Sequence, residues 1–420
     1  MTDTLLACRD CGQLHRADAG VLRRRWVSCR RCGARLWRRS VIGLADLFAF
    51  AATAVILFVL ANAFPLFDIS LTGDRRSGRI ASGVVALAGY GGGISAVGVL
   101  VALIALLIPA LSIGLVATAL GWLNAAAPKA DRRRRKIAGL WRAVLRLRPW
   151  SMLDVYLLGA VVAYTRLDQL TGVRVAIAAG GYALAALVLA QILIEQSLGR
   201  QRVWGALGDP AKYAPAPGDA WVLCLDCDLV IGVGTAGAAP RNCPRCAARL
   251  TPRRTGSLAA TAALTTAGYI LYVPANLLPV LTITRFGRTD PYTILGGVRD
   301  LATAGLWPLA LLVLVASIIV PGLKLAGLTW FLIAVRLRAA SLLRPRTALY
   351  RFINFIGRWS NIDVFVVSIL VALVQFGNLT TIAPGPGIAC FAAVVAATMV
   401  ATRVFDPRLM WDAALARRHG

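Results

Sequence analysis

Long apolar stretches recur along the chain and are separated by shorter polar ones. A helix that crosses a bilayer needs about 20 apolar residues, and eight stretches approach or exceed that length. They cover residues 41–64, 94–123, 152–170, 174–195, 257–279, 304–335, 361–380 and 384–404. The second and sixth stretches are longer than one crossing and contain Pro109 and Pro321, so we expect helices there that are kinked or that protrude from the membrane. The pattern predicts an all-α polytopic membrane protein.

Short motifs recur between the two halves of the chain at a nearly constant distance. "NAFPLF" (62–67) matches "NLLPVL" (276–281), "PALSIG" (109–114) matches "PGLKLA" (321–326), and "RPWSMLDVYLLGAVVA" (148–163) matches "GRWSNIDVFVVSILVA" (357–372). The offsets are 214, 212 and 209 residues, which indicates an internal duplication. An even number of helices in each half gives both halves the same orientation, so the repeat is parallel.

The duplication predicts a tandem arrangement of two transmembrane modules with four helices each. The first module covers residues 41–196 and the second module covers residues 257–405. A small polar region precedes each module, at residues 1–40 and 197–256, and a polar tail follows at residues 406–420.

The charge pattern predicts which ends of the helices face the cytoplasm. Of the 420 residues, 58% are hydrophobic and 15% are charged, and the net charge is +27. If the N-terminus, residues 124–151, 195–257 and 335–360, and the tail share one side, that side holds 37 of the 46 lysines and arginines. The positive-inside rule then puts both termini in the cytoplasm. The basic run at 131–136 lies in a short loop between crossings, so we expect it to attract anionic lipid and not nucleic acid.

Two cysteine clusters predict metal centres. Each has the pattern CxxC, a gap of 17 or 15 residues, and a second CxxC. The residues are Cys8, Cys11, Cys29 and Cys32 in the first cluster, and Cys224, Cys227, Cys243 and Cys246 in the second. One turn aims two thiolates at an ion and two turns complete a tetrahedron, so the spacing favours a structural zinc ribbon at each cluster. A rubredoxin-like iron site uses the same ligands. Cytoplasmic thiols stay reduced, which disfavours disulfides.

One lysine, Lys324, lies inside an apolar stretch of the second module. A lysine within a transmembrane helix costs a few kcal/mol unless it is paired or solvated. Asp363 lies four residues past Trp359 in the next crossing, and Ser360 lies on a similar face. We therefore expect Lys324, Asp363 and Ser360 to meet in a polar cluster. The alternative is a buried ion pair that only fixes helix packing.

The first half departs from this pattern. Ser112 occupies the position of Lys324, while Asp154 still matches Asp363. Asp154 has no evident cationic partner in the sequence, so we expect it to be protonated or capped by Ser151 and backbone groups. We infer that the second module carries the cleft and that the first serves more as a scaffold.

Taken together, these motifs resemble the paraquat-inducible protein A family, including its LetA branch. The resemblance covers nearly the whole chain. It rests on the paired CxxC clusters, the "N..P" ends of the first helices, the "WSxxDV" starts of the third helices, and the closing "FDPRLMWD" (405–412). It implies that each half packs four helices around a cleft in the inner membrane of a Gram-negative bacterium. It also implies a role in moving lipids between the inner and outer membranes, with a periplasmic MCE-domain tunnel protein as partner.

Two functions remain open at this stage. The first is an inner-membrane component that passes phospholipid or other lipophilic molecules to the periplasmic tunnel. The second is a membrane scaffold, or a metal or redox sensor that uses its zinc ribbons. The chain has two histidines and no Walker, Ser-His-Asp or H-E-x-x-H motif, so we expect it not to be an enzyme.

Overall fold

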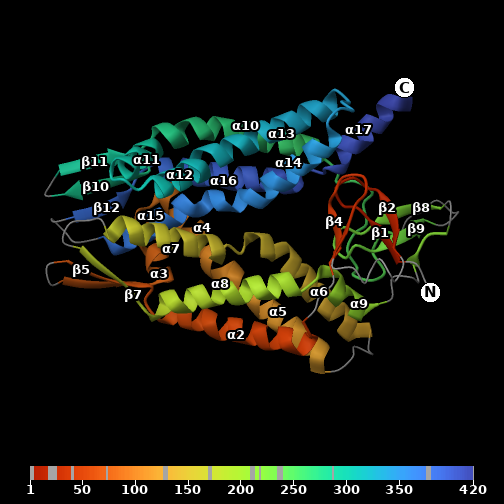
Figure 1. Ribbon diagram of the computed structural model, residues 1–420, viewed down its shortest axis with the longest axis horizontal. Helices are drawn as coiled ribbons and strands as arrows, with labels where there is room; N and C mark the ends of the chain where they lie inside the picture. Colours follow the sequence, from red (N-terminus) through yellow and green to blue (C-terminus); the bar gives the residue numbers. More distant parts are fainter. Residues whose placement is uncertain are drawn as a thin grey trace.

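The computed structural model is elongated, with its helices running along the long axis (Figure 1). It describes residues 4–17, 26–38, 42–71, 74–125, 131–168, 173–208, 213–216, 219–233, 240–285, 288–374 and 380–419. Two small β domains lie at the end of the molecule that also carries both termini (Figure 1). Short sheets lie at the opposite end (Figure 1).

The first module and its neighbours are mostly helical. Its elements are α2 (Leu44–Ala63), β5 (Phe67–Leu71), β6 (Asp74–Gly78), α3 (Ile80–Ala88), α4 (Gly92–Val101), η1 (Ala102–Leu107), α5 (Ile108–Ala125), α6 (Asp131–Leu147), η2 (Arg148–Trp150), α7 (Leu153–Asp168), β7 (Val173–Ile177) and α8 (Ala179–Ser197). Helix α9 (Arg200–Leu207) follows.

The second module repeats this order. Its elements are α10 (Ser257–Leu277), β10 (Leu281–Arg285), β11 (Arg288–Tyr292), α11 (Ile294–Thr303), α12 (Trp307–Leu314), η4 (Val315–Ile319), α13 (Val320–Arg336), α14 (Leu343–Ile356), η5 (Gly357–Asn361), α15 (Ile362–Leu373), β12 (Thr380–Pro384) and α16 (Gly387–Val404). Helix α17 (Arg408–His419) closes the chain.

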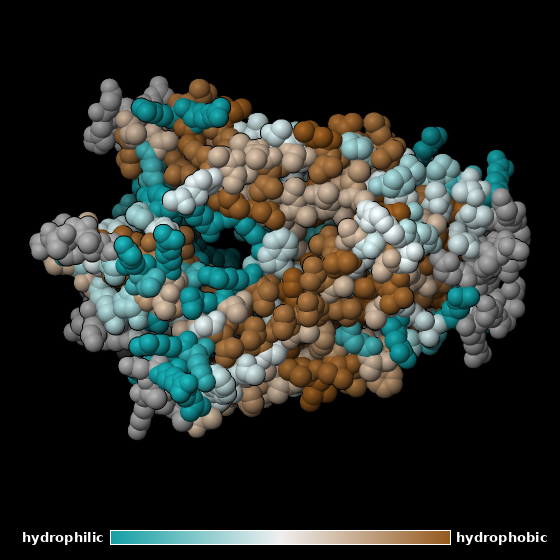
Figure 2. Space-filling view, turned by 180° about the vertical axis from the view of Figure 1, so that it is seen from behind, coloured by the Kyte–Doolittle hydropathy of each residue, from teal (hydrophilic) through white to brown (hydrophobic). Residues whose placement is uncertain are grey.

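Within the described residues, seven helical stretches are long and apolar enough to cross a membrane. They are Leu44–Ala63, Gly92–Ala125, Ala179–Ser197, Ser257–Leu277, Trp307–Arg336, Leu343–Leu373 and Gly387–Val404. Helix α7 has 16 residues and is shorter than these stretches. Figure 2 shows a broad hydrophobic band over the helices, with hydrophilic residues gathered toward both ends. This distribution is the one expected of a polytopic membrane protein.

Each module also contains a three-stranded antiparallel sheet, which an all-α prediction omits. Strand β5 pairs with β6 and β7, and β10 pairs with β11 and β12. Ile69 and Ile283, 214 residues apart, occupy the same register in the two sheets. The strands at 173–177 and 380–384 fall within or between stretches that hydropathy alone assigns to helices. Their apolar residues extend the hydrophobic signal of the adjacent helices, so hydropathy does not separate the two structures.

The long second helix of each half contains a short π-helical segment. η1 ends just before Pro109, and η4 ends just before Pro321. A proline cannot donate to the carbonyl four residues earlier, and a local π-helical turn accommodates that loss. At both prolines the structure therefore has a short π-helical segment in which the backbone hydrogen bonds shift from the α-helical pattern.

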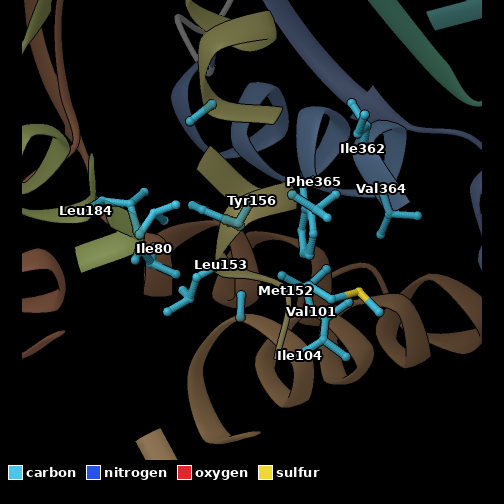
Figure 3. Close-up of a cluster of buried hydrophobic side chains, with 14 of the residues drawn as sticks. Ile80, Val101, Ile104, Met152, Leu153, Tyr156, Leu184, Ile362, Val364 and Phe365 are labelled. Atoms are coloured by element: carbon cyan, nitrogen blue, oxygen red, sulfur yellow. The ribbon is translucent and has the colours of Figure 1, made fainter. Parts of the chain in front are cut away.

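Helix α15 forms the centre of the contact between the two modules. It packs along α3 and α7 of the first module, and nearly all its residues are buried. The rings of Tyr156 and Phe365 meet edge to face at 5.1 Å, and Figure 3 shows both within the buried apolar cluster. A helix that is hydrophobic on most sides is stable only where other elements cover most sides. Helix α15 meets this condition because elements of both modules pack against it.

Close approach of α3 and α15 depends on Gly83. A Cβ at this position would lie 2.4 Å from the Ser368 Oγ and 2.9 Å from its backbone oxygen. We expect Gly83→Ala to lower stability by about 1–3 kcal/mol, because overpacking forces the helices apart. Gly114→Ala is the control, since a Cβ there meets nothing within 4 Å. Thermal unfolding in detergent should show a lower midpoint for Gly83→Ala only. An equal midpoint for both variants would contradict the close packing.

Candidate functional site

The eight predicted ligand cysteines lie in four turns of the same design. In each turn the backbone N–H of the residue after the second cysteine donates to the carbonyl of the first, at 2.8–2.9 Å. That residue has a positive φ in all four cases: Gly12 (73°), Gly33 (75°), Asp228 (59°) and Ala247 (57°). Glycine adopts this conformation without strain, while the other two residues adopt it at a cost. The turns direct both thiols of each CxxC toward one point.

The four thiols of each cluster fit a tetrahedral ion. All four sulfur atoms lie within 4.8 Å of one another, and all eight cysteines are buried. The nearest pairs are 3.5–3.6 Å apart, and none of the cysteines forms a disulfide. Zn–S bonds of about 2.3 Å in a tetrahedron require sulfur atoms nearly 4 Å apart. Each cluster can therefore hold one metal ion.

His15 belongs to the surroundings of the first cluster. Its Nε2 lies 3.2 Å from Cys29 Sγ, and the side chain is half-buried. Burial and the nearby Arg30 lower the pKa of His15. The sequence does not show that His15 lies near the cluster. Its position there depends on the pairing of β1 with β2, which sets His15 opposite Leu6.

The two β domains pack against each other. Ribbon 1 contains β1 (Thr4–Ala7), β2 (Leu14–Ala17), β3 (Trp26–Ser28) and β4 (Arg35–Arg38), and ribbon 2 contains β8 (Ala220–Leu223) and β9 (Val230–Val233). Ala7, Leu223 and Val230 form a shared buried cluster. Arg9 forms an ion pair with Asp228 and donates to the carbonyl of Leu225 at 2.5 Å. The ribbons therefore form one unit, a point on which the sequence is silent.

This unit is attached to the second module by arginine contacts. Arg351 of α14 donates to Asp10 at 3.2 Å and to the carbonyl of Cys32 at 3.0 Å. Arg344 of α14 donates to the carbonyl of Arg31 at 2.7 Å. Because α14 leads through η5 into α15, ribbon 1 contacts the helical segment that carries Asp363.

The closing motif "FDPRLMWD" joins the tail to both ribbons. Arg253, after ribbon 2, donates to Asp412 at 2.5 and 2.9 Å, and Arg31 of ribbon 1 stacks on Trp411 at 4.4 Å. Asp406 and Arg408 form a buried pair at 2.7 Å. Burial alone would raise the pKa of Asp406, but the hydrogen bonds from Arg408 outweigh it and lower that pKa. The motif therefore has a structural role in this fold.

Lys324 is fully buried, and its partner is a hydroxyl group. Its Nζ donates to the Thr398 Oγ1 of α16 at 3.3 Å. A Cβ on Gly357 would meet its Cε at 3.1 Å, so the ammonium end lies against η5. The structure describes both Lys324 and Asp363, and no ion pair within 4.0 Å joins them. Thr398 was not a predicted site residue, because a threonine in an apolar helix gives no signal of its own.

The Asp363 carboxylate lies close to other polar groups. It is 8% exposed, and its neighbours are the hydroxyl of Ser317 and, at longer range, the guanidinium of Arg166. The hydroxyls of Ser317 and Ser360 are buried, and neither has a hydrogen-bond partner of ordinary geometry. Buried polar groups are nearly always satisfied in native structures, so these two hydroxyls mark a polar interior around Asp363 that has room for further hydrogen bonds.

Asp154 has a cationic partner after all, and it comes from the other module. Arg358 of η5 lies 3.5 Å from the Asp154 carboxylate. From the repeat, a partner of Asp154 would be sought in the first half, at the position that matches Lys324. Ser112 occupies that position, and its buried hydroxyl has no hydrogen-bond partner. Asp154 therefore contributes to the contact between modules.

A cavity of about 250 Å³ lies between the modules at the sheet end of Asp363. Arg166 and Leu167 of α7 line one side, while most other lining residues belong to the second module. They include Asp363, Val366, Val367 and Leu370 of α15, Gly297, Asp300 and Leu301 of α11, and Leu281, Ile283, Tyr292 and Ile382 of the sheet. The cavity combines apolar walls with three charged groups.

Comparison with known proteins places these features in a family. A model of the paraquat-inducible protein A family matches residues 44–208 and 258–414. The intermembrane transport protein PqiA of Escherichia coli (strain K12) is 30% identical over 395 residues, which cover 92% of this chain and 90% of that protein. The lipophilic envelope-spanning tunnel protein A of the same strain is 30% identical over 386 residues, with 92% and 86% covered.

A more distant relative covers almost the full length of both chains. A probable intermembrane transport protein of Haemophilus influenzae is 26% identical over 410 residues, or 97% of this chain and 95% of that protein. No solved structure matched the chain. The two matched regions lie one in each half of the chain, in line with a tandem repeat, and the chain belongs to the paraquat-inducible protein A family.

Proposed function

We propose that this chain is the inner-membrane component of an intermembrane lipid-transport system. It takes phospholipid or other lipophilic molecules from the membrane and passes them to a periplasmic MCE-domain tunnel protein. The names of the relatives, intermembrane transport protein and lipophilic envelope-spanning tunnel protein, support this proposal. It is a transport activity and not an enzymatic one.

The observation that carries the proposal is the polar interior of the second module. Lys324 and Asp363 are buried without an ion pair between them, and their polar neighbours are the hydroxyls of Thr398 and Ser317. Ionisable groups inside a membrane are expensive and mark substrate or ion pathways. The adjacent cavity gives that pathway an apolar wall against which acyl chains can pack.

The proposed orientation follows from the charge pattern. Both ribbons and both termini lie in the cytoplasm, and the sheets of β5 and β10 face the periplasm, where the partner docks. Each module contributes four crossings, with α7 as the shortest. Each ribbon holds one structural zinc ion, because four cysteine thiolates in a closed site favour zinc.

A second candidate function is a metal or redox sensor. The contacts of Arg351 with Asp10 and Cys32 favour it, because they link the first metal cluster to the helix that leads to Asp363. A closed four-thiolate site resists redox cycling, however, and makes this candidate the weaker one.

Photocrosslinking in living cells tests the transport proposal. A photoreactive residue at Val367, which lines the cavity, should capture phospholipid. Leu158 is the matched control, since it occupies the equivalent position 209 residues earlier. We expect strong lipid labelling at Val367 and little at Leu158. Absence of lipid at Val367 would favour the scaffold or sensor instead.

A further inference from the structure

The repeat brings equivalent glycines to two different environments. "IASGVVALA" (80–88) of α3 matches "ILGGVRDLA" (294–302) of α11, so Gly83 corresponds to Gly297 and Ala86 to Asp300. Gly83 allows α3 to pack directly against Ser368 of α15. Gly297 instead lies beneath an arginine, because a Cβ there would meet the terminal nitrogens of Arg166 at 3.6 and 3.7 Å. The interface between α3 and α15 is therefore tightly packed, whereas the equivalent interface between α11 and α7 contains a cavity.

Arg166 lies at the edge of this cavity without a partner. Its Nε–H is buried and has no acceptor to donate to, and in the described part of the chain the side chain forms no hydrogen bond or ion pair. Asp300 and Asp363 act on it only at longer range. A guanidinium is a rigid fork of five donors, so leaving it unpaired beside an open volume is costly unless a ligand completes it.

The lining of the cavity restricts the class of ligand. Apart from its charged groups, the cavity lining is largely apolar and includes Leu281, Ile283, Val366, Val367 and Leu370. Guanidinium groups bind phosphate through two parallel hydrogen bonds. A molecule that satisfies both surfaces has a phosphate at one end and a hydrocarbon chain at the other. Arg166 is near the C-terminal end of α7, toward the sheets, where a lipid headgroup would lie.

We propose that Arg166 binds the phosphate of a phospholipid whose acyl chain enters the cavity between α7, α11 and α15. This inference rests on the proposed transport function and specifies the part of the substrate that is recognised. The two carboxylates of the cavity also affect where the phosphate can lie. Asp300 and Asp363 line the cavity, within electrostatic range of Arg166. A phosphate on the guanidinium would be repelled by both carboxylates, which restricts it to the side of Arg166 that faces away from them.

The test measures ligand-induced thermal stabilisation of the full chain in detergent. Three probes are compared at equal concentration: dioctanoyl phosphatidylglycerol, dioctanoylglycerol and inorganic phosphate. A ligand that binds only the folded state raises the unfolding midpoint. We expect the phospholipid to raise it and the other two probes to have little effect. Equal stabilisation by inorganic phosphate would indicate a free-phosphate site, and equal stabilisation by dioctanoylglycerol would indicate an apolar pocket only. Either result would overturn the proposal.

Substitutions identify the cation. Arg166→Gln should weaken phospholipid binding at least tenfold, and Arg166→Lys should retain part of the affinity. Arg299→Gln is the control, because Arg299 lies exposed on α11 and does not line the cavity. A purely structural role for Arg166 would lower the midpoint without ligand and leave the binding constant unchanged.

Failure of this inference can be separated from failure of the proposed function. If Arg166→Gln binds the phospholipid as well as the wild type does, while Val367 still captures lipid in cells, the headgroup assignment is wrong and transport stands. If Val367 captures no lipid, the transport proposal itself fails.

Discussion

Replacing Lys324 by methionine is expected to abolish lipid transport while leaving the protein at least as abundant as the wild type. Methionine has nearly the same length and no charge. The change therefore removes the donor to Thr398 while still filling the space beside Gly357. A charged lysine at membrane depth costs about 3 kcal/mol or more. Removing it should stabilise the fold, so a loss of function would come from lost chemistry.

The control for this substitution is Arg336→Met on the same helix. Arg336 lies at the end of α13 and is exposed, so its loss should change neither abundance nor transport. Thr398→Val removes only the acceptor and should give a partial defect. Protein abundance is measured by immunoblot, and transport by sensitivity of the outer membrane to detergent. Normal transport in an abundant Lys324→Met protein would reduce Lys324 to a packing residue.

The metal clusters were predictable from sequence because their geometry is local. Four residues of a CxxC turn determine where both thiols point, and the structure repeats this turn four times with the same hydrogen bonds. The burial of Lys324 was also predictable, since hydropathy over neighbouring residues is enough to place a helix in the membrane. Both inferences depend on residues that are close in the chain.

The partners of the buried charges were not predictable in the same way. Lys324 contacts Thr398 of its own module, 74 residues away, where α13 packs against α16. The half-buried Asp154 instead contacts Arg358 of the other module. For Asp154 the repeat suggests a partner within its own half, whereas α15 packs between α3 and α7 of the opposite half. Pairing across the modules depends on how the halves dock, and a motif offset carries no information about docking.

The way the two modules pack explains where their sequences differ. The sequence shows that Lys324 is matched by Ser112, which suggests a diverged first module. In the structure the first module supplies α3 as a closed packing surface and α7 as one wall of the cavity. In the proposal made here for Arg166, this module also supplies the group that binds the headgroup, and it would then be more than a scaffold.

Loss of one cysteine ligand is expected to remove one of two metal ions and to destabilise the whole cytoplasmic unit. Structural zinc contributes about 10–16 kcal/mol to the folding of small ribbons, which is more than a domain of this size gains from its own core. Cys227→Ser should therefore unfold ribbon 2. Since ribbon 2 packs on ribbon 1 through Leu223 and Val230, ribbon 1 should become sensitive to protease as well.

Metal analysis by mass spectrometry on the purified chain decides between the two roles of the ribbons. The wild type should contain about two zinc ions, in line with its two clusters, and Cys227→Ser about one. Cys390→Ser is the control, since Cys390 lies in α16 away from both clusters and should leave the zinc content unchanged. Mild oxidant should not release zinc from a closed four-thiolate site. Release at a low dose would instead support the sensor, because the contact of Arg351 with Cys32 would then carry the redox state to α14.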